Sequence, residues 1–145
     1  MPSFEENLAR AEHVYVFRIV SQELTDSDIW PSKVRGRVAV VRTLLGGQPS
    51  IQQLEFTMGA HCGIKLAVGR FYLVALENDT TSISLVPGDQ SVLDVTDGFK
   101  DGSRSNPDAL GPVLQYLSGE PLPKDYPGAY RLSSTLSCLP PPAGT

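Results

Sequence analysis

The chain has 145 residues, of which 41% are hydrophobic and 19% charged, and its net charge is -4. This composition argues against a disordered chain, the length fits one domain, and the acidic balance gives no bulk attraction for nucleic acid or anionic membrane. No apolar run reaches the ~20 residues that a membrane-spanning helix needs, so we expect no membrane span.

The first part of the chain predicts a short helix and then a long strand. Ser3 and Glu6 have the spacing of a capping box, which indicates a helix over residues 3–11. Residues 13–22 are rich in Val, Tyr, Phe and Ile, and both faces of this strand are apolar, which is typical of a strand buried on both sides. One face carries Val14, Val16 and Val20, and the other carries Tyr15, Phe17 and Ile19.

A polar connection over residues 23–33 leads to a second strand over residues 34–45, which alternates between two faces. One face carries Val34, Val38 and Val40, and the other carries Arg35, Arg37 and Ala39. Because Arg35, Arg37 and Arg42 follow one β-like segment, we interpret them as a solvated face.

The middle of the chain predicts three further strands, over residues 50–58, 70–77 and 80–86. The second and third of these flank a short polar turn, so we expect them to form a hairpin. A short edge strand is expected over residues 92–95.

An Asn-Pro pair opens a second helix over about residues 107–118, and Gly119 ends it. Residues 120–145 form a proline-rich, irregular tail. These elements predict a mostly β fold, a five-stranded OB-fold-like barrel over about residues 12–96 with a helix at each end. No linker interrupts the chain, so residues 1–145 are expected to form a single domain.

One stretch of the chain resembles a known family. Cys62-Gly63 is followed by Gly69 and by a Tyr-Leu-Val strand that begins at Tyr72. This pattern resembles the middle of the netrin-like domains, a group that includes the tissue inhibitors of metalloproteinases and their bacterial relatives. The order of the upstream helix and strands also fits, so the resemblance covers about residues 3–86. It implies a five-stranded barrel of the same type.

Two features depart from the family pattern. Phe17 stands where relatives often have Gly, and no Cys-x-Cys precedes the first helix. In the animal inhibitors, the amino-terminal Cys chelates the zinc ion of the target protease. We therefore expect that residues 1–4 do not inhibit metalloproteinases in this way.

The resemblance implies an extracytoplasmic protein-binding module whose partner is another protein, such as a protease. The first ten residues are polar and acidic, so we expect the leader of a secreted, periplasmic or lipid-anchored protein to be absent from this sequence. Two alternatives stay open. One is an enzyme of unrecognised type. The other is a nucleic-acid- or glycan-binding barrel that uses one face made of Tyr15, Phe17, Arg35 and Arg37.

The sequence contains no Gly-rich phosphate loop, no spaced pair of carboxylates and no Ser/His/Asp pattern, so we expect no enzymatic activity and no cofactor. His61 and Cys62 are two adjacent zinc ligands where a site needs three or four, so we expect no metal site. The candidate binding residues are Trp30, which precedes Pro31 in the polar connection, together with His61 and Tyr15.

The resemblance also implies a disulfide, because relatives bond the Cys of Cys-Gly to a distant part of the chain. Cys138 is the only other cysteine here, so we predict a Cys62–Cys138 bond, which contributes ~4 kcal/mol in the chain-entropy model. The alternative pairs these residues with cysteines that this sequence lacks, and it predicts free thiols. Mass spectrometry after alkylation without reductant distinguishes the two, since two alkylated thiols in air-oxidised protein would contradict the bond.

Overall fold

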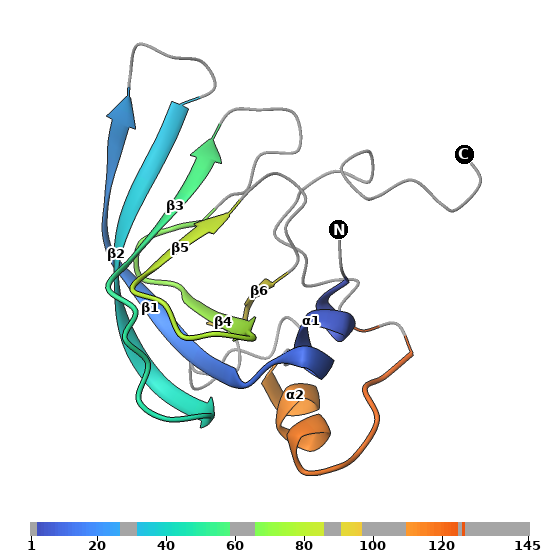
Figure 1. Cartoon of the computed structure of the whole chain (residues 1–145). Coiled ribbons are helices and arrows are strands. Elements are labelled where there is room, and N and C mark those ends of the chain that lie inside the picture. Colours follow the sequence, from blue (N-terminus) through green and yellow to red (C-terminus); the bar gives the residue numbers. More distant parts are fainter. Residues whose placement is uncertain are drawn as a thin grey trace, which may run out of the picture.

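The chain forms a curled six-stranded sheet with one short helix before it and another after it (Figure 1). The computed structural model describes residues 3–26, 32–58, 66–85, 91–96, 110–124 and 126. The elements are α1 (Phe4–Arg10), β1 (His13–Asp26), β2 (Ser32–Leu45), β3 (Gln53–Met58), β4 (Phe71–Leu76), β5 (Ser82–Leu85), β6 (Val92–Asp94) and α2 (Leu110–Leu117). The predicted mostly β class with flanking helices is confirmed.

The strand order is β5-β3-β2-β1-β4-β6, in which β3 and β5 are parallel and every other neighbouring pair is antiparallel. The sheet curls into a half-barrel, with β1 and β2 as its longest strands (Figure 1). The edge strand predicted over residues 92–95 is confirmed as β6. The described sheet therefore has six strands rather than the five of the predicted barrel.

The predicted hairpin of β4 and β5 is wrong, because β5 pairs with β3 and not with β4. The turn between β4 and β5 is bound to the segment that precedes β3. The Asp79 carboxylate accepts hydrogen bonds from the Ser50 N–H at 3.0 Å and from the Ser50 hydroxyl at 2.7 Å. The Gln52 N–H donates to the Thr81 carbonyl at 2.9 Å. These bonds bring the start of β5 to the edge of β3.

β1 and β2 pair along almost their whole length, with irregularities that bend them. One register shift leaves Val20 without a cross-strand partner, and another leaves Val41 without one. Such bulges bend a strand and increase its twist. The connection predicted over residues 23–33 is wrong at both ends, because β1 and β2 extend into it. Glu23 lies opposite Arg35 there, and opposite charges favour cross-strand pairing.

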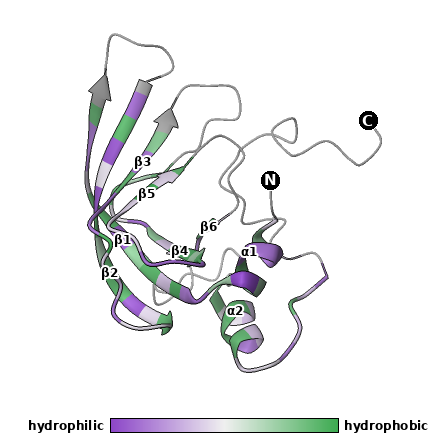
Figure 2. Cartoon of the chain, in the orientation of Figure 1, coloured by the Kyte–Doolittle hydropathy of each residue, from purple (hydrophilic) through white to green (hydrophobic). Residues whose placement is uncertain are grey.

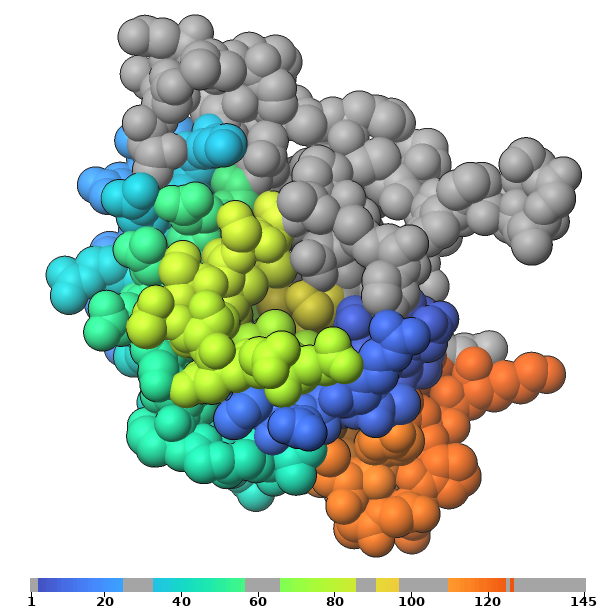
Figure 3. Space-filling view, viewed as in Figure 1, coloured from blue at the N-terminus to red at the C-terminus, as the bar shows by residue number. Residues whose placement is uncertain are grey.

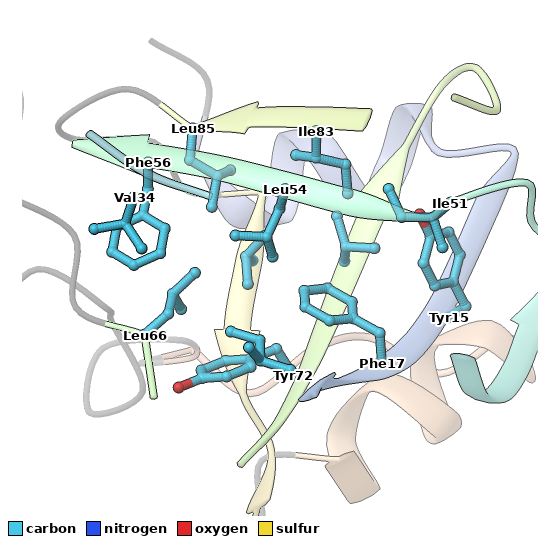
Figure 4. Close-up of a cluster of buried hydrophobic side chains, with 13 residues drawn as sticks. Tyr15, Phe17, Val34, Ile51, Leu54, Phe56, Leu66, Tyr72, Ile83 and Leu85 are labelled. Carbon is cyan, nitrogen blue, oxygen red and sulfur yellow. The ribbon is translucent and has the colours of Figure 1, made fainter. Parts of the chain in front are cut away.

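The first half of β1 is buried on both faces, as predicted. Tyr15 and Phe17 point into an interior cluster that the curled sheet encloses (Figure 4). Val14 and Val16 belong to a second cluster, which they share with side chains of both helices, β4 and β6. The expectation that Val20 continues this buried row is wrong, since its side chain is 49% exposed. The helix side chains reach only the first half of β1.

The helix ends follow local sequence chemistry. The Ser3 hydroxyl accepts a hydrogen bond from the Glu6 N–H at 3.1 Å and so caps α1. α2 ends at Gly119, as predicted, with a φ of 112° that favours glycine. The N–H groups of Gly119 and of the next residue donate to carbonyls in the last turn of α2, both at 3.0 Å, which is a Schellman motif. The predicted start of this helix near residue 107 lies outside the described residues.

We predict that Gly46→Ala destabilises the fold more than Gly69→Ala. Both glycines have positive φ, 85° and 88°, so alanine introduces backbone strain of roughly 1–2 kcal/mol at either position. At Gly46 a Cβ would also lie 2.6 Å from the Glu12 carbonyl oxygen and 2.7 Å from His13 Nδ1, whereas at Gly69 nothing lies within 4 Å. Urea unfolding should show the lower midpoint for Gly46→Ala, and equal midpoints would contradict this close approach.

Candidate functional site

The helices leave much of the outward side of the sheet exposed. α1 and α2 lie side by side against β4 and the first half of β1 (Figures 1 and 3). Beyond this part of β1, outward side chains of β1, β2 and β3 form a surface that we call the outer face. The outer face consists of Arg18, Val20, Ser21, Glu23, Arg35, Arg37, Ala39, Val41, Arg42, Gln53 and Glu55. All of them are exposed except Gln53 and Glu55, which are half-buried.

Strand alternation and register produce the outer face. Along β2, hydrophilic and hydrophobic residues alternate, so that the valines predicted to face inward do so and the arginines face outward (Figure 2). Across the strands, Arg18 lies opposite Ala39, and Ser21 lies opposite Arg37. Because directly opposed residues point to the same side of a sheet, these pairs form one continuous surface.

The outer face exposes apolar side chains at its bulges. Val20 is 49% exposed and Val41 is 43% exposed. The inner side of the sheet beside them is packed around Ile19 and Val40, so these half-exposed side chains point outward. A bulge residue escapes the regular alternation, which explains how a valine reaches solvent in strands whose other valines are buried or half-buried.

Charge is distributed unevenly on the outer face. Arg35 forms an ion pair with Glu55, at 3.1 Å between Nη2 and Oε1. In contrast, no ion pair between described residues involves Arg18, Arg37 or Arg42. The middle of the outer face thus carries three cations that the rest of the described chain does not neutralise.

The aromatic side chains of β1 point away from the outer face. Tyr15, Phe17 and Tyr72 belong to the interior cluster, where the Phe17 and Tyr72 ring centroids lie 5.9 Å apart. The expected common face of Tyr15 and Phe17 with Arg35 and Arg37 is therefore wrong, because alternation sends the rings inward and the arginines outward. Tyr15, a predicted binding residue, is 0% exposed and presents no surface to a partner.

The Tyr15 hydroxyl lies near the end of the half-barrel where β3 begins. It is buried and has no hydrogen-bond partner among the described residues. Burial, and to a smaller extent the charge of Asp79, raises the pKa of Tyr15 to about 12. Hydrogen bonds from Ser50 lower the pKa of Asp79, so its carboxylate is charged at neutral pH. The phenol therefore stays protonated at neutral pH, and the carboxylate serves to bind the segment before β3.

The structure does not describe the other predicted site residues. Trp30, His61, Cys62 and Cys138 lie outside the described residues, so the contact role of the first two and the disulfide of the last two stay predictions. Within the described ranges, no three metal-ligating side chains come together.

A groove of about 540 Å³ lies between α1, α2 and the end of β2. Its lining is mostly apolar, with side chains of Leu8, Ala11, Leu45 and Leu117, and Glu120 is the one charged residue that lines it. This groove offers a partner mainly apolar contacts, whereas the outer face places apolar and cationic side chains next to each other.

The chain matches no model of a known protein family and no curated protein sequence. Among the described helices, neither is long and apolar enough to cross a membrane.

Sequence reasoning missed the outer face as a site because it interpreted the arginines of β2 as an ordinary solvated face. A signal was present in the charge balance. β2 contains Lys33, Arg35, Arg37 and Arg42 but no Asp or Glu, although the chain as a whole carries a net charge of -4. Such local segregation of one charge sign is a feature of binding surfaces.

We predict that Tyr15→Phe leaves stability at pH 7 unchanged or raises it, because it removes a buried hydroxyl without a partner. Since burial raises the pKa of Tyr15 from 10 to about 12, the wild-type protein loses stability as the pH rises through this range, and the variant, which lacks the phenol, should resist alkaline unfolding better. Tyr72→Phe is the matched control. It removes a hydrogen bond of 2.8 Å from the Ala67 N–H and should cost about 1 kcal/mol at pH 7. Equal losses for the two variants in urea at pH 7 would contradict the assignment.

Proposed function

We propose that this chain is an extracytoplasmic protein-binding module of the netrin-like type, and that it binds its partner through the outer face. The observation that carries the proposal is the outer face itself, where Val20 and Val41 are half-exposed at the bulges of β1 and β2. Exposed valines in a structured strand lose little conformational entropy on binding, since β-branched side chains have few rotamers. The resemblance to netrin-like domains supports the extracytoplasmic location.

The composition of the outer face favours a protein partner. Protein interfaces combine apolar contacts with arginines, which donate several hydrogen bonds from one planar group. Arg18 and Arg37 supply this chemistry next to Val20. Proteins that bind single-stranded nucleic acid instead stack the bases on exposed aromatic rings. No residue of the outer face is aromatic, and Phe71, which lies opposite Arg18 on β4, is half-buried, so the outer face offers no fully exposed ring.

We propose no catalytic role for the described residues. The polar groups that converge at one end of the half-barrel are Ser50 and Asp79, and their hydrogen bonds to each other hold the β4–β5 turn. Asp94 is similarly occupied. Burial raises its pKa, but hydrogen bonds from Arg70 and Thr96 lower it more, so the net shift is downward. These carboxylates are structural partners rather than free acids or bases.

Site-specific photo-crosslinking tests the proposal. A benzoylphenylalanine at Val20 or at Val41 should crosslink to one protein in the extracytoplasmic fraction of the source organism, and an excess of unmodified chain should prevent it. The same group at Arg10, which is exposed on α1, is the control and should not crosslink to that protein. Mixing the purified partner with the chain should then reconstitute the complex.

Two results would contradict this function. One is a crosslinked partner that reacts equally from Arg10 and from the valines, which would show that the outer face is not the contact. The other is recovery of nucleic acid or glycan, rather than protein, at the valine positions.

A further inference from the structure

The cross-strand neighbours of the outer-face arginines differ from one end of β2 to the other. Near the start of β2, Arg35 lies between Glu23 on β1 and Glu55 on β3, and it forms an ion pair with Glu55. Two carboxylates thus surround one arginine. This end of the outer face is neutralised from within the sheet.

The residues directly opposite the other arginines are all uncharged, although Glu23 and Glu55 are diagonal to Arg37 and form no ion pair with it. Arg37 lies between Ser21 and Gln53, and Arg18 lies between Ala39 on β2 and Phe71 on β4. Arg42 lies opposite Val16. All three arginines are exposed, and no ion pair between described residues involves them.

The sheet holds these three charges close to one another. Arg18 lies directly opposite Ala39, which follows Arg37 by two residues on the same face, so Arg18 and Arg37 are diagonal neighbours whose backbones lie about 7–8 Å apart. Arg42 lies beyond Val41 on the other side of Ala39. Like charges at this distance repel each other in the free protein. Ala39, the smallest side chain of the group, leaves room between the three guanidinium groups.

We infer that the partner proposed above presents carboxylates to Arg18, Arg37 and Arg42, around an apolar residue that contacts Ala39 and Val41. The inference rests on the proposed function and adds the chemistry of the partner, an acidic polypeptide surface. Carboxylates suit the site because each guanidinium can form two parallel hydrogen bonds with one carboxylate. Binding would also remove the repulsion between the arginines.

The surroundings of the three arginines favour carboxylates of a protein over phosphates of a nucleic acid. A nucleic acid carries a charge on every nucleotide, so a strand that follows β2 would pass Glu23 and Glu55. An acidic protein segment places its carboxylates at discrete positions, and its apolar side chains match the exposed valines. The net charge of -4 also opposes long-range attraction of a polyanion.

A titration with synthetic peptides tests the inference. The probe is a blocked octapeptide of alternating Glu and Val, and its reference is the same peptide with Gln in place of Glu. We expect the Glu peptide to shift the backbone amide signals of β1 and β2 in nuclear magnetic resonance spectra, and to bind at least tenfold more tightly than the Gln peptide. Raising the salt concentration from 50 to 500 mM should weaken the binding at least tenfold.

Charge-reversal variants locate the effect. Arg18→Glu with Arg37→Glu should abolish binding of the Glu peptide, whereas Arg10→Glu with Lys124→Glu changes the net charge by the same amount on exposed positions elsewhere and should retain it. The neutral variant Arg18→Gln with Arg37→Gln should also lose binding. Its urea midpoint at low salt shows that it is folded, and this midpoint should be equal to or higher than that of the wild type because the variant removes the repulsion between the two arginines.

The inference is overturned if neither peptide binds, if the Gln peptide binds equally well, if the control pair loses binding to the same extent, or if an eight-nucleotide DNA strand binds more tightly than the Glu peptide. The crosslinking experiment shows whether the acidic-partner inference alone has failed or the protein-binding function has failed with it. A protein that crosslinks from Val20 and Val41 and still binds the Arg18→Glu, Arg37→Glu variant would leave the protein-binding function standing and refute the acidic partner.

Discussion

The arrangement of the whole molecule depends on the first half of β1, which separates two hydrophobic clusters. Alternation along one strand sends Tyr15 and Phe17 to the interior and Val14 and Val16 to the helices. Full burial of such a side chain contributes roughly 1.5–3 kcal/mol, so both faces favour one register strongly. A slip by one residue would exchange the two sets and place the rings among the helices. β1 also pairs with both β2 and β4, so its register is passed to the rest of the sheet.

The length of the helices sets how much of β1 can be buried on its outward side. α1 has 7 residues and α2 has 8, which correspond to about 10–12 Å of helix. A strand advances about 3.3 Å per residue, so even a helix of this length that lay along β1 would shield only three or four of its residues. The outward burial of β1 accordingly includes Val14 and Val16 and has ended at Arg18. The exposed outer face is thus a direct consequence of short helices on long strands.

Local patterns in the sequence predicted most of the elements but not their partners. The capping residue Ser3, the stop at Gly119 and the alternation of β2 are each decided by neighbours within a few residues, and the structure confirms them. The partner of β5 depends on the hydrogen bonds between Asp79 and Ser50, which are 29 residues apart. A turn between two apolar runs looks the same whether the strands pair with each other or separate.

In the outer face, too, local patterns predicted the direction of the side chains but not their cross-strand neighbours. Alternation correctly predicted that Arg35 and Arg37 point outward, and the residue types alone gave no reason to distinguish them. Their difference comes from register, which places Glu23 and Glu55 beside the first and Ser21 and Gln53 beside the second. Likewise, no local pattern marks Val20 as a bulge residue, because a bulge is a mismatch in the pairing of two strands and depends on both β1 and β2.

Two features that lower the stability of the folded protein occur together on the outer face. Unneutralised arginines at diagonal positions repel each other, and half-exposed valines forgo the stabilisation that burial would give them. Either alone is unremarkable on a protein surface, where single apolar residues and single charges are common. Here Arg18 and Arg37 flank the same part of β1 and β2 as Val20, and the carboxylates of the outer face, Glu23 and Glu55, lie directly opposite Arg35 and form no ion pair with either arginine. Departures from locally optimal sequence concentrate at functional sites, where a partner compensates for them. The coincidence of both features in one exposed area therefore supports binding, rather than folding, as the reason for the outer face.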